Sequence, residues 1–511
     1  MAAGDRSGTS AVGDVLVAID VGTSGARAVL FDLEGHRLAE HRRAYPTRSP
    51  HTAWAEQDGR SWRGAALGAL ADLAHGLGPG IRVRAIGLTG QCPSVVPVDR
   101  RGEPVGPGMI YRDNRAVTEA EEIRARWGDA FIHGRTGHLP AAFHAGAKVL
   151  WLRRHRPDVF ARTYRFLQPR DLVAFALTGE WATDGSHAAA TLFHDLRGRR
   201  WDPELLAAFD LPADCWPPLR ASWEVLGPVR PALAARLGLA GEIPVILGGA
   251  DSQACALGAG VVAPGPVSEM AGSSTCLNAA VPEPLAVLEV THYPHVTPGM
   301  YTTETGINTT GAAVSWLAGL VYGGRGGRPR TADWARLDAD AARVAPGADG
   351  VLALPVLGDG ERDDPTLRGA FTGLSLRHGR AELARAMLEG SALEMGLQLD
   401  LLRSAGTPVT ELRVSGGDAR LATWNQVKAD VLGIPVVAIA GDAAVTGVAM
   451  LAGIGAGIYR DVDEAIARCV HVAERREPDP GAAATYRAIA PRYRELVDAA
   501  VVRRAGGEPG G

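Results

Sequence analysis

The chain has 511 residues, a formal net charge of −4 and a hydrophobic content of 46%. A chain of this length is too long to fold around a single hydrophobic core, which favours two large domains. The small net charge gives no reason to expect a nucleic acid or an anionic membrane surface as a partner. Five scattered cysteines, without a CxxC pair, argue against a disulfide framework or a structural zinc site and favour a cytoplasmic location.

Both ends of the chain and one internal stretch are expected to lack regular structure. Residues 1–13 are polar and glycine-rich and contain no apolar core of a signal peptide. Residues 323–331 combine glycine with arginine and are predicted to form a surface loop, and 505–511 are predicted to be a disordered tail. No apolar run approaches the length of a membrane span, so no membrane partner is expected.

The first predicted elements form a hairpin with a polar turn. Val15–Ile19 is apolar at every position, as expected of a strand buried on both faces, and it ends at Asp20. Gly22-Thr23-Ser24-Gly25 then turns the chain, and Arg27 leads into the second strand. Such a turn offers N–H and hydroxyl donors to a phosphate, and Asp20 can hold hydrated Mg²⁺. An ordinary hairpin without a ligand is the alternative, because short glycine patterns often match by chance.

Two later segments end in polar side chains. A buried strand at 83–88 is followed by Gln91-Cys92-Pro93, and a short apolar segment ends in Tyr111 and Asp113. Polar side chains at the carboxyl ends of strands are where α/β folds keep their ligands. The alternative for Asp113 is a cap for the helix expected at 116–127.

Strands and helices are expected to alternate along the rest of the chain. Helices are predicted near 62–77, 145–154, 381–402, 421–432, 443–456 and 486–503, whereas 183–201 is predicted as a loop and 217–241 as connecting structure. This alternation indicates α/β layers.

The stretch from Ile243 to Gly260 is the centre of the predicted organisation. Ile243–Leu247 has the pattern of a buried strand, which breaks at Gly248-Gly249 and is followed by a small-residue helix with Asp251 in its first turn. A carboxylate there accepts the first N–H groups of the helix, which favours its ionised form. This stretch alone fits a capping aspartate and also a fixed, charged base at a strand end.

The second half of the chain repeats the plan of the first. A strand at 267–270 leads into a turn with Gly272 and Ser273, and a return strand follows at 276–280. Gly311 opens a helix, and a strand at 412–414 runs into Gly416-Gly417-Asp418. Two such turns in two halves would hold the phosphates of a nucleotide from both sides.

Together these motifs resemble those of the FGGY family of carbohydrate kinases. The residues that carry the resemblance are Asp20 to Arg27, Glu56-Gln57-Asp58 with Trp62, Lys148 to Leu152, Gly369 to Leu374 with Glu389, and Ser415 to Arg420 with Trp424-Asn425-Gln426. One departure is Ala145, where the first family signature prefers Pro, Ser or Thr. The resemblance implies a two-domain, actin-like (ribonuclease H-like) ATPase fold. It divides the chain into a sugar and phosphate domain at 14–250, a nucleotide domain at 251–460 and a helical tail at 461–511.

The resemblance also implies a role for each matching residue. Asp251 corresponds to the general base that takes the proton from the attacking sugar hydroxyl, and Asp20 to the acid that holds Mg²⁺ through water. The residues implied to bind ATP are Gly22, Thr23, Ser24, Arg27, Gly272, Ser273, Gly311, Gly416, Gly417 and Asp418. Those implied to bind the sugar are Gln91, Cys92, Pro93, Tyr111, Asp113, Asp251 and Ser252. ATP, Mg²⁺ and a small sugar are therefore the expected ligands, with a homodimer left open.

The overall pattern is most similar to the xylulokinase branch of the family. Members of that branch typically carry Met-His-Gly after the glutamine, where this chain has Cys92-Pro93-Ser94. The missing histidine removes a hydroxyl partner, and one lost hydrogen bond can change substrate choice by orders of magnitude. Phosphorylation of D-xylulose to D-xylulose 5-phosphate is the leading expectation. Ribulose, a hexulose, gluconate or erythritol as substrate, and an inactive sugar-sensing ATPase, are the alternatives.

Overall fold

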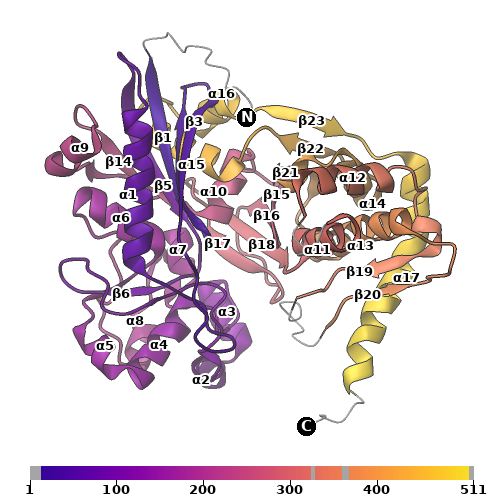
Figure 1. Cartoon of the computed structure of the whole chain (residues 1–511). Helices are drawn as coiled ribbons and strands as arrows, with labels where there is room; N and C mark the ends of the chain where they lie inside the picture. Colours follow the sequence, from indigo (N-terminus) through magenta and orange to yellow (C-terminus); the bar gives the residue numbers. More distant parts are fainter. Residues whose placement is uncertain (1–12, 324–328, 359–366, 506–511) are drawn as a thin grey trace. The chain divides into compact units, whose positions relative to one another are not determined.

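The computed structural model describes residues 13–323, 329–358 and 367–505, except for the side chains of 418 and 501–505 (Figure 1). The predicted leader and the predicted C-terminal tail lie almost entirely outside these residues, as does the centre of the predicted loop at 323–331. Within the described ranges, no helix is both long and apolar enough to cross a membrane.

The chain forms two compact units, each with its own sheet and hydrophobic core. Unit 1 comprises the residues up to Ala254 together with Ala444–Cys469, and unit 2 comprises Cys255–Ala443 and the residues from Val470 onward. The segment Ala444–Cys469 thus belongs to unit 1, and the expected tail from 461 is divided between the units. Two units of alternating strands and helices confirm the predicted α/β class.

A six-stranded mixed sheet forms the centre of unit 1, with the order β13-β14-β5-β1-β2-β3. Its strands are β1 (Asp14–Val21), β2 (Gly25–Phe31), β3 (Arg37–Ala44), β5 (Arg82–Gly90), β13 (Val225–Pro228) and β14 (Pro244–Ala250). Strands β1, β5 and β14 run parallel, whereas β2, β3 and β13 are antiparallel to their neighbours. The predicted first hairpin is confirmed as β1 and β2, and β14 is the strand predicted before Asp251.

Helices cover both faces of this sheet, which explains its continuously apolar strands. One face packs against α1 (Gly59–His75) and α6 (Pro169–Thr178) in the main core of unit 1. On the other face lies α15 (Ala443–Gly455), so close that a Cβ at Gly87 would meet the Val448 carbonyl oxygen at 2.6 Å. Glycine at position 87 therefore permits the close approach of this helix to the sheet.

Smaller elements complete unit 1. Strand β4 (Glu56–Gln57) pairs with β7 (Gly108–Met109), and β6 (Val96–Val98) pairs with β8 (Arg165–Leu167). The remaining predicted and unpredicted helices are α2 (Val117–Trp127), α3 (Asp129–Thr136), α4 (Ala145–His155), α5 (Pro157–Arg162), α8 (Pro203–Ala208), α10 (Asp251–Gly258) and α16 (Val462–Cys469). Helix α10 begins in unit 1, and its residues from Cys255 belong to unit 2.

Two segments of unit 1 are more ordered than predicted, so their interpretation as loop and connecting structure is wrong. The segment 183–201 contains β9 (Thr183–Asp184), α7 (Gly185–Ala189), β10 (His194–Asp195) and β11 (Arg200–Trp201). The segment 217–241 contains β12 (Leu219–Arg220), β13 and α9 (Pro231–Leu237). These elements are two to seven residues long, which is too short for a periodic pattern to reveal them.

Unit 2 repeats the sheet of unit 1, as the sequence predicted. Its order is β17-β18-β16-β15-β21-β22-β23. The strands are β15 (Gly265–Ala271), β16 (Thr275–Val281), β17 (Thr291–Pro294), β18 (Tyr301–Ile307), β21 (Val409–Gly416), β22 (Val436–Ile439) and β23 (Val472–Arg476). Strands β18, β16 and β15 are antiparallel to their neighbours in this set and correspond to β3, β2 and β1 of unit 1. Strands β21 and β22 run parallel to β15 and correspond to β5 and β14. The antiparallel edge strand β23 corresponds to β13.

Helices pack against this second sheet. They are α11 (Thr310–Tyr322), α12 (Thr331–Ala341), α13 (Arg380–Ser404), α14 (Ala422–Leu432) and α17 (Pro480–Ala505), with the short elements η1 (Ala348–Gly350), η2 (Asp418–Arg420), β19 (Leu352–Leu354) and β20 (Ala370–Thr372). Apolar residues of α11, α12, α13 and α14 form the core of unit 2 with the sheet. The final helix is held to α13, because Tyr486 Oη donates to Glu389 Oε1 at 2.7 Å.

Candidate active site

Three parallel strands of unit 1 end beside one another in polar residues. The register pairs Asp20 of β1 with Thr89 of β5, and Thr89 with Gly249 of β14. Asp251 follows β14 directly and opens α10. The predicted metal ligand Asp20 and the predicted base Asp251 therefore lie at one edge of the same sheet, the edge at which α/β folds bind ligands.

The turn between β1 and β2 carries the predicted phosphate-binding residues of unit 1. The Gly22 N–H donates to Gly25 O at 3.1 Å and closes the turn. Arg27 Nε donates to Asp20 Oδ2 at 2.9 Å, so the predicted phosphate-binding arginine pairs with the predicted metal ligand. Their side chains are 21% and 13% exposed, which keeps both charges in contact with solvent at the turn. Thr23 and Ser24 lie in this turn between Gly22 and Gly25.

The groups at this turn fit a magnesium nucleotide. The place of a Cβ on Gly22 lies 3.7 Å from Asp20 Oδ2, so this glycine lies directly beside the carboxylate. Among the residues that the structure describes, no three or more His, Cys, Asp or Glu side chains are grouped to hold a metal. Mg²⁺ commonly uses one or two carboxylates together with water and substrate phosphates. Asp20 can supply a carboxylate of this kind.

Gln57 links the predicted sugar residue Gln91 to the phosphate turn. Its Oε1 accepts from Gln91 Nε2 at 3.0 Å and from Trp62 Nε1 at 2.6 Å. Its Nε2 donates to Thr23 O at 2.7 Å. The motif Glu56-Gln57-Asp58 with Trp62 contributed to the resemblance, but the structure now gives Gln57 a position in the site that the sequence analysis did not assign.

The predicted sugar residue Asp113 is fully buried in a network of hydrogen bonds. Its Oδ2 accepts from Ala55 N and from Arg115 Nη2, both at 2.6 Å, and its Oδ1 accepts from Arg115 Nε at 2.8 Å. Helix α2 begins after Ala116 without a side-chain cap, so the interpretation of Asp113 as its cap is wrong. These bonds hold the loop that carries the partly exposed Tyr111.

Lys148 lies beneath the same loop. Its Nζ is fully buried and donates to Ile110 O at 2.7 Å. Burial lowers the pKa of Lys148 to about 7, although the charges of Asp113 and Cys92 act in the opposite direction. The structure therefore brings the predicted sugar residues Cys92 and Asp113 into the surroundings of one buried lysine.

Asp251 is partly buried, and its carboxylate binds the start of α10. Its Oδ1 accepts from Ser252 N at 2.9 Å, an N–H in the first turn of the helix. Ser252 is buried, and its Oγ accepts from Gln253 Nε2 at 3.2 Å. The helix start favours the ionised carboxylate, which is the form that accepts a proton. The contact of Asp251 with the start of the helix is therefore compatible with the role of a base.

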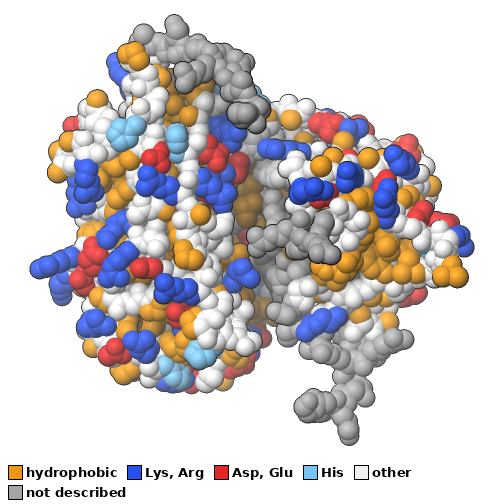
Figure 2. All heavy atoms as spheres, viewed as in Figure 1, with side chains coloured by type: hydrophobic (Ala, Val, Ile, Leu, Met, Phe, Trp, Pro, Cys, Tyr) orange, Lys and Arg blue, Asp and Glu red, His pale blue; other side chains and the backbone are white. Residues whose placement is uncertain are grey.

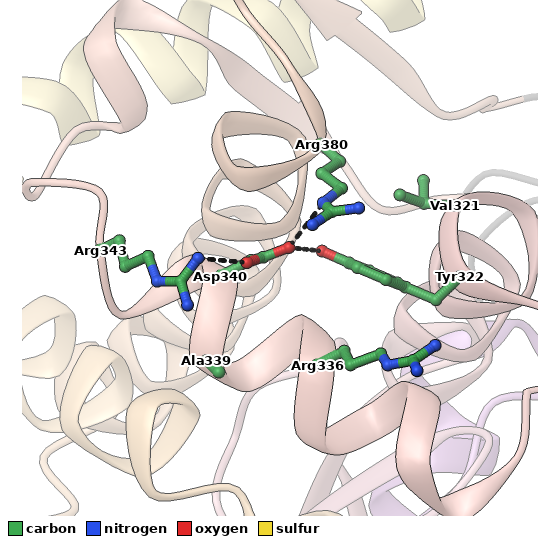
Figure 3. A pocket seen from close by; sticks show the side chains of 7 residues that line it. All are labelled: Val321, Tyr322, Arg336, Ala339, Asp340, Arg343 and Arg380. Atoms are coloured by element: carbon green, nitrogen blue, oxygen red, sulfur yellow. Dashed lines mark hydrogen bonds and ion pairs between the residues drawn. The ribbon is translucent and has the colours of Figure 1, made fainter.

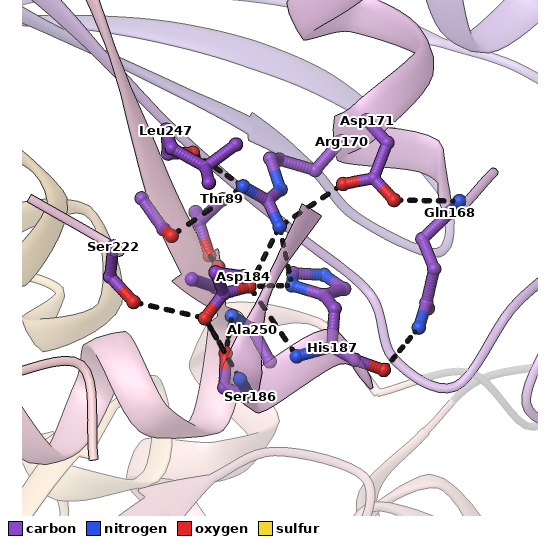
Figure 4. Close-up of polar contacts among 12 residues, drawn as sticks. Thr89, Gln168, Arg170, Asp171, Asp184, Ser186, His187, Ser222, Leu247 and Ala250 are labelled. Atoms are coloured by element: carbon purple, nitrogen blue, oxygen red, sulfur yellow. Dashed lines mark hydrogen bonds and ion pairs between the residues drawn. The ribbon is translucent and has the colours of Figure 1, made fainter. Parts of the chain in front are cut away.

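A buried polar cluster lies behind β14 and was not predicted (Figure 4). It contains Arg170 of α6, Asp184 and Ser186 at the start of α7, and His187, all at most 1% exposed. The one sequence signal for it is the order Asp184-Gly185-Ser186, since Asp184 caps α7 by accepting from Ser186 N and His187 N. That signal marks a helix start, but it does not indicate what the helix contacts.

The predicted nucleotide residues of unit 2 gather at its own hairpin. Gly272 and Ser273 form the turn between β15 and β16, and Gly272 N donates to Ser274 O at 3.1 Å. Ala312 N, in the first turn of α11 next to Gly311, donates to Ser273 O at 2.9 Å. The two segments predicted to contact phosphate are therefore bonded to each other.

The end of β21 lies beside this hairpin. Ala271 of β15 pairs with Gly416, where a Cβ would meet the Ala271 carbonyl oxygen at 2.3 Å. Among the described residues, nothing lies within 4 Å of the place of a Cβ on Gly417. The side chain of Asp418 lies outside the described residues.

The second lysine of the chain is buried under these nucleotide-side segments. Lys428 Nζ donates to both carboxylate oxygens of Glu269 at 2.8 Å, and neither side chain is exposed. Lys428 belongs to α14, which follows η2, and Glu269 lies two residues before the end of β15. Trp424 packs against the ammonium group at 4.4 Å from the ring centroid. This ion pair ties β15 to α14.

A surface hollow of about 520 Å³ in unit 2 contains none of the predicted site residues (Figure 3). At its centre, Asp340 accepts from Tyr322 Oη at 2.7 Å, from Arg380 Nε at 2.8 Å and from Arg343 Nη1 at 3.2 Å. The third arginine of the hollow, Arg336, pairs with Asp333 at 3.7 Å, so each of the three is paired with a carboxylate. Figure 2 shows the same interleaving of basic and acidic side chains over the visible surface, in keeping with the small net charge.

Family models match both halves of the chain. Residues 15–258 match the N-terminal domain of the FGGY family of carbohydrate kinases, and residues 268–456 match its C-terminal domain. The chain belongs to the FGGY family of carbohydrate kinases. It is therefore a phosphotransferase with an alcohol group as acceptor, on the actin-like ATPase fold that the resemblance implied.

Individual FGGY kinases similar to this chain differ in their substrates. A xylulose kinase from Escherichia coli is 31% identical over 82% of this chain and 84% of its own length. A glycerol kinase from Gloeobacter violaceus is 33% identical over 90% of this chain and 92% of its own. The crystal structure of a xylulose kinase from Rhodospirillum rubrum superposes with a TM-score of 0.86 at 33% identity, covering 94% of this chain and 98% of that one.

Proposed function

We propose that this FGGY kinase transfers the γ-phosphoryl group of ATP to a hydroxyl of a ketopentose, with D-xylulose to D-xylulose 5-phosphate as the leading reaction. The observation that carries the proposal is the placement of Asp20 and Asp251 at the same end of the parallel strands β1 and β14, which flank β5. Asp20 is the proposed metal ligand and Asp251 the proposed general base. The similarity to xylulose kinases from two bacteria supports the choice of sugar.

The chemistry needs little more from the protein than position and charge. Phosphoryl transfer proceeds through a loose transition state, so in-line placement and stabilisation of charge supply most of the acceleration. An ionised aspartate of ordinary basicity is then sufficient to accept the hydroxyl proton late in the reaction. The first turn of α10 favours this form of Asp251, because the positive end of the helix dipole stabilises a carboxylate.

The nucleotide would be held by the two hairpin turns and the glycines beside them. In unit 1 these are Gly22, Thr23, Ser24 and Arg27, and in unit 2 Gly272, Ser273, Gly311, Gly416, Gly417 and Asp418. Mg²⁺, when bound with ATP, neutralises charge that develops on the phosphates. Asp20 is the carboxylate proposed to hold it, and Arg27 both pairs with Asp20 and adds a positive charge at the turn.

The proposed sugar site comprises Gln91, Cys92, Pro93, Tyr111, Asp113 and Ser252 together with Asp251. Gln91 is oriented by Gln57, and Asp113 is oriented by Arg115. Glycerol remains the second candidate substrate, because a glycerol kinase is 33% identical over most of the chain. A site built for a hydroxyl rejects an analogue that lacks it by large factors, so one altered contact can decide between these substrates.

ADP release across a substrate panel tests the proposal. The purified protein with MgATP is assayed with D-xylulose, D-ribulose, a ketohexose, gluconate, glycerol and erythritol. We expect the highest kcat/KM for D-xylulose. A higher value for another panel member would replace D-xylulose as the substrate, and no sugar-dependent ADP release in a protein that still binds ATP would contradict the kinase activity itself.

The same panel on the double variant Cys92→Met, Pro93→His tests the sugar site. Restoring the histidine typical of xylulokinases is expected to change the ratio of kcat/KM for D-xylulose to that for glycerol by about tenfold or more, because it adds a hydroxyl partner. An unchanged ratio would remove Cys92 and Pro93 from the specificity-determining residues.

A further inference from the structure

The end of β14, just before Asp251, is not a regular strand. The pairing of β14 with β5 shifts register between Ile246 and Gly249. Gly248 lies in this irregularity with φ of +73°, and a Cβ there would meet the Leu88 carbonyl oxygen at 1.7 Å. A bulge of this kind changes the direction of the chain and removes ladder hydrogen bonds from the strand. The backbone groups next to it need other partners.

Side chains of the surrounding elements supply those partners (Figure 4). Arg170 Nη1 donates to Leu247 O at 2.7 Å, and Thr89 Oγ1 donates to Gly249 O at 2.8 Å. Ser186 Oγ accepts from the N–H of Ala250 at 2.9 Å. Three side chains from three different elements therefore hold the three residues that surround the bulge.

Asp184 organises two of these side chains. Its Oδ1 accepts from Arg170 Nη2 at 2.7 Å and lies 2.9 Å from His187 Nδ1, while its Oδ2 accepts from Ser186 Oγ at 2.5 Å and from Ser222 Oγ at 2.9 Å. Burial alone would raise the pKa of the Asp184 carboxyl, but the charge of Arg170 and the hydrogen bonds from His187 and Ser186 hold it below its ordinary value. Asp184 is therefore a buried, ionised centre with a partner for each oxygen.

We propose that Thr89, Arg170 and Ser186, held in part by Asp184, are positioning residues that fix where the Asp251 carboxylate stands. This inference rests on the proposed role of Asp251 as general base. Ala250 is the residue immediately before Asp251, and its N–H is fixed by Ser186. A catalytic group displaced by about 1 Å can cost about 100-fold in rate. The end of β14, which lacks regular ladder hydrogen bonds, therefore needs these side chains to fix its position.

Two serines allow a matched test of this role. Ser186 and Ser222 are both buried, and each donates its hydroxyl to Asp184 Oδ2. The Ser186 hydroxyl also accepts from Ala250 N. Among the residues that the structure describes, the Ser222 hydroxyl makes no hydrogen bond to β14, and only the Ser222 carbonyl accepts from Gly248 N. Ser186→Ala removes the hold on Ala250, and Ser222→Ala weakens only the partner set of Asp184.

The experiment compares both variants with the wild-type protein, using MgATP and the panel sugar with the highest turnover. For Ser186→Ala we expect kcat to fall by about 10- to 100-fold while the KM for ATP changes less than twofold. For Ser222→Ala we expect kcat within about threefold of wild type. Equal kcat values for the two variants would overturn the proposal, because a merely structural cluster would respond to the loss of either hydroxyl.

A second pair keeps the test decisive if Ser186→Ala does not fold. Thr89→Val removes the donor to Gly249 O at nearly constant shape, and Thr89→Ser retains it. We expect the valine variant to lose kcat by about tenfold or more and the serine variant to keep it; equal rates would contradict the positioning role. Asp251→Asn is assayed in parallel. If Asp251→Asn stays active, the proposed function is contradicted. If Asp251→Asn is inactive but the two variants within each pair have equal kcat values, only the positioning inference is contradicted.

Discussion

Lys148 illustrates how a single residue of this protein is governed by its surroundings. The ammonium group is fully buried beneath the loop of Ile110 and Asp113, and burial lowers its pKa to about 7 from the ordinary 10.5. Between these two values the unfolded chain binds a proton at Lys148 that the folded protein largely lacks. Since the stability of a protein rises with pH wherever the unfolded state binds more protons, Lys148 makes unit 1 more stable as the pH rises above 7.

Lys148→Met tests this linkage. The variant cannot titrate at this position, and its loss of the hydrogen bond to Ile110 O gives an offset that does not depend on pH. From pH 7 to pH 9, the free energy of unfolding of the wild type is expected to rise relative to the variant by about 2 kcal/mol. Urea denaturation at a series of pH values measures the difference. Parallel pH profiles for the two proteins would show that Lys148 titrates normally.

Other single residues show where prediction from the sequence reached its limit. Asp20 and Asp251 could be selected because each follows an apolar strand, and the strand register then places them at one sheet edge. Arg170 and Asp184 could not be selected from the sequence, because their proposed role depends on contacts between distant segments. Arg170 donates to Asp184, 14 residues away in the chain, and to Leu247, 77 residues away. Nothing in the local pattern around either residue indicates β14 as the partner.

At the scale of elements, the irregular end of β14 requires a glycine at position 248. Gly248 has a φ of +73°, and the Leu88 carbonyl oxygen occupies the place of a Cβ. The apolar run predicted the strand, and the glycine pair predicted its break. The bulge itself follows from packing against β5, which no local pattern reveals.

Gly248→Ala is therefore expected to destabilise unit 1 strongly. The new methyl group clashes with backbone that cannot move without breaking the sheet, and the residue must also keep a left-handed conformation. We expect a loss of more than about 2 kcal/mol in the free energy of unfolding. Gly64→Ala is the matched control, because Gly64 is exposed inside α1 and a Cβ there meets nothing within 4 Å. Alanine at 64 should be neutral or slightly stabilising, and similar effects at both positions would contradict the packing argument.

The length of an element decided whether the sequence revealed it. The long helices α1, α13 and α14 and the buried strands β1, β5 and β14 were predicted to within a few residues, because apolar periodicity extends along each of them. The segments 183–201 and 217–241 were misjudged, since α7 has five residues and β13 has four. The unpredicted cluster around Asp184 lies in the first of these segments.

At the scale of the whole molecule, two units repeat one plan. Each unit has a hairpin with a glycine-containing polar turn, continued by two parallel strands and an antiparallel edge strand. The repetition was visible in the sequence because both hairpins have the same order of apolar strand, polar turn and apolar strand. One of the two lysines is buried in each unit, Lys148 beneath the loop of the proposed sugar residue Asp113 and Lys428 beneath the proposed nucleotide segments.

The central claim is that Asp251 is the base of a sugar kinase, and Asp251→Asn tests it most directly. The variant and the wild type are compared for sugar-dependent ADP release and for ATP binding by calorimetry, with Asp99→Asn, a turn aspartate of unit 1, as the control. We predict that Asp251→Asn lowers kcat by about 1,000-fold or more, while the Kd for ATP changes less than twofold and Asp99→Asn behaves like the wild type. Sugar-dependent turnover of Asp251→Asn within about tenfold of wild type would contradict the account.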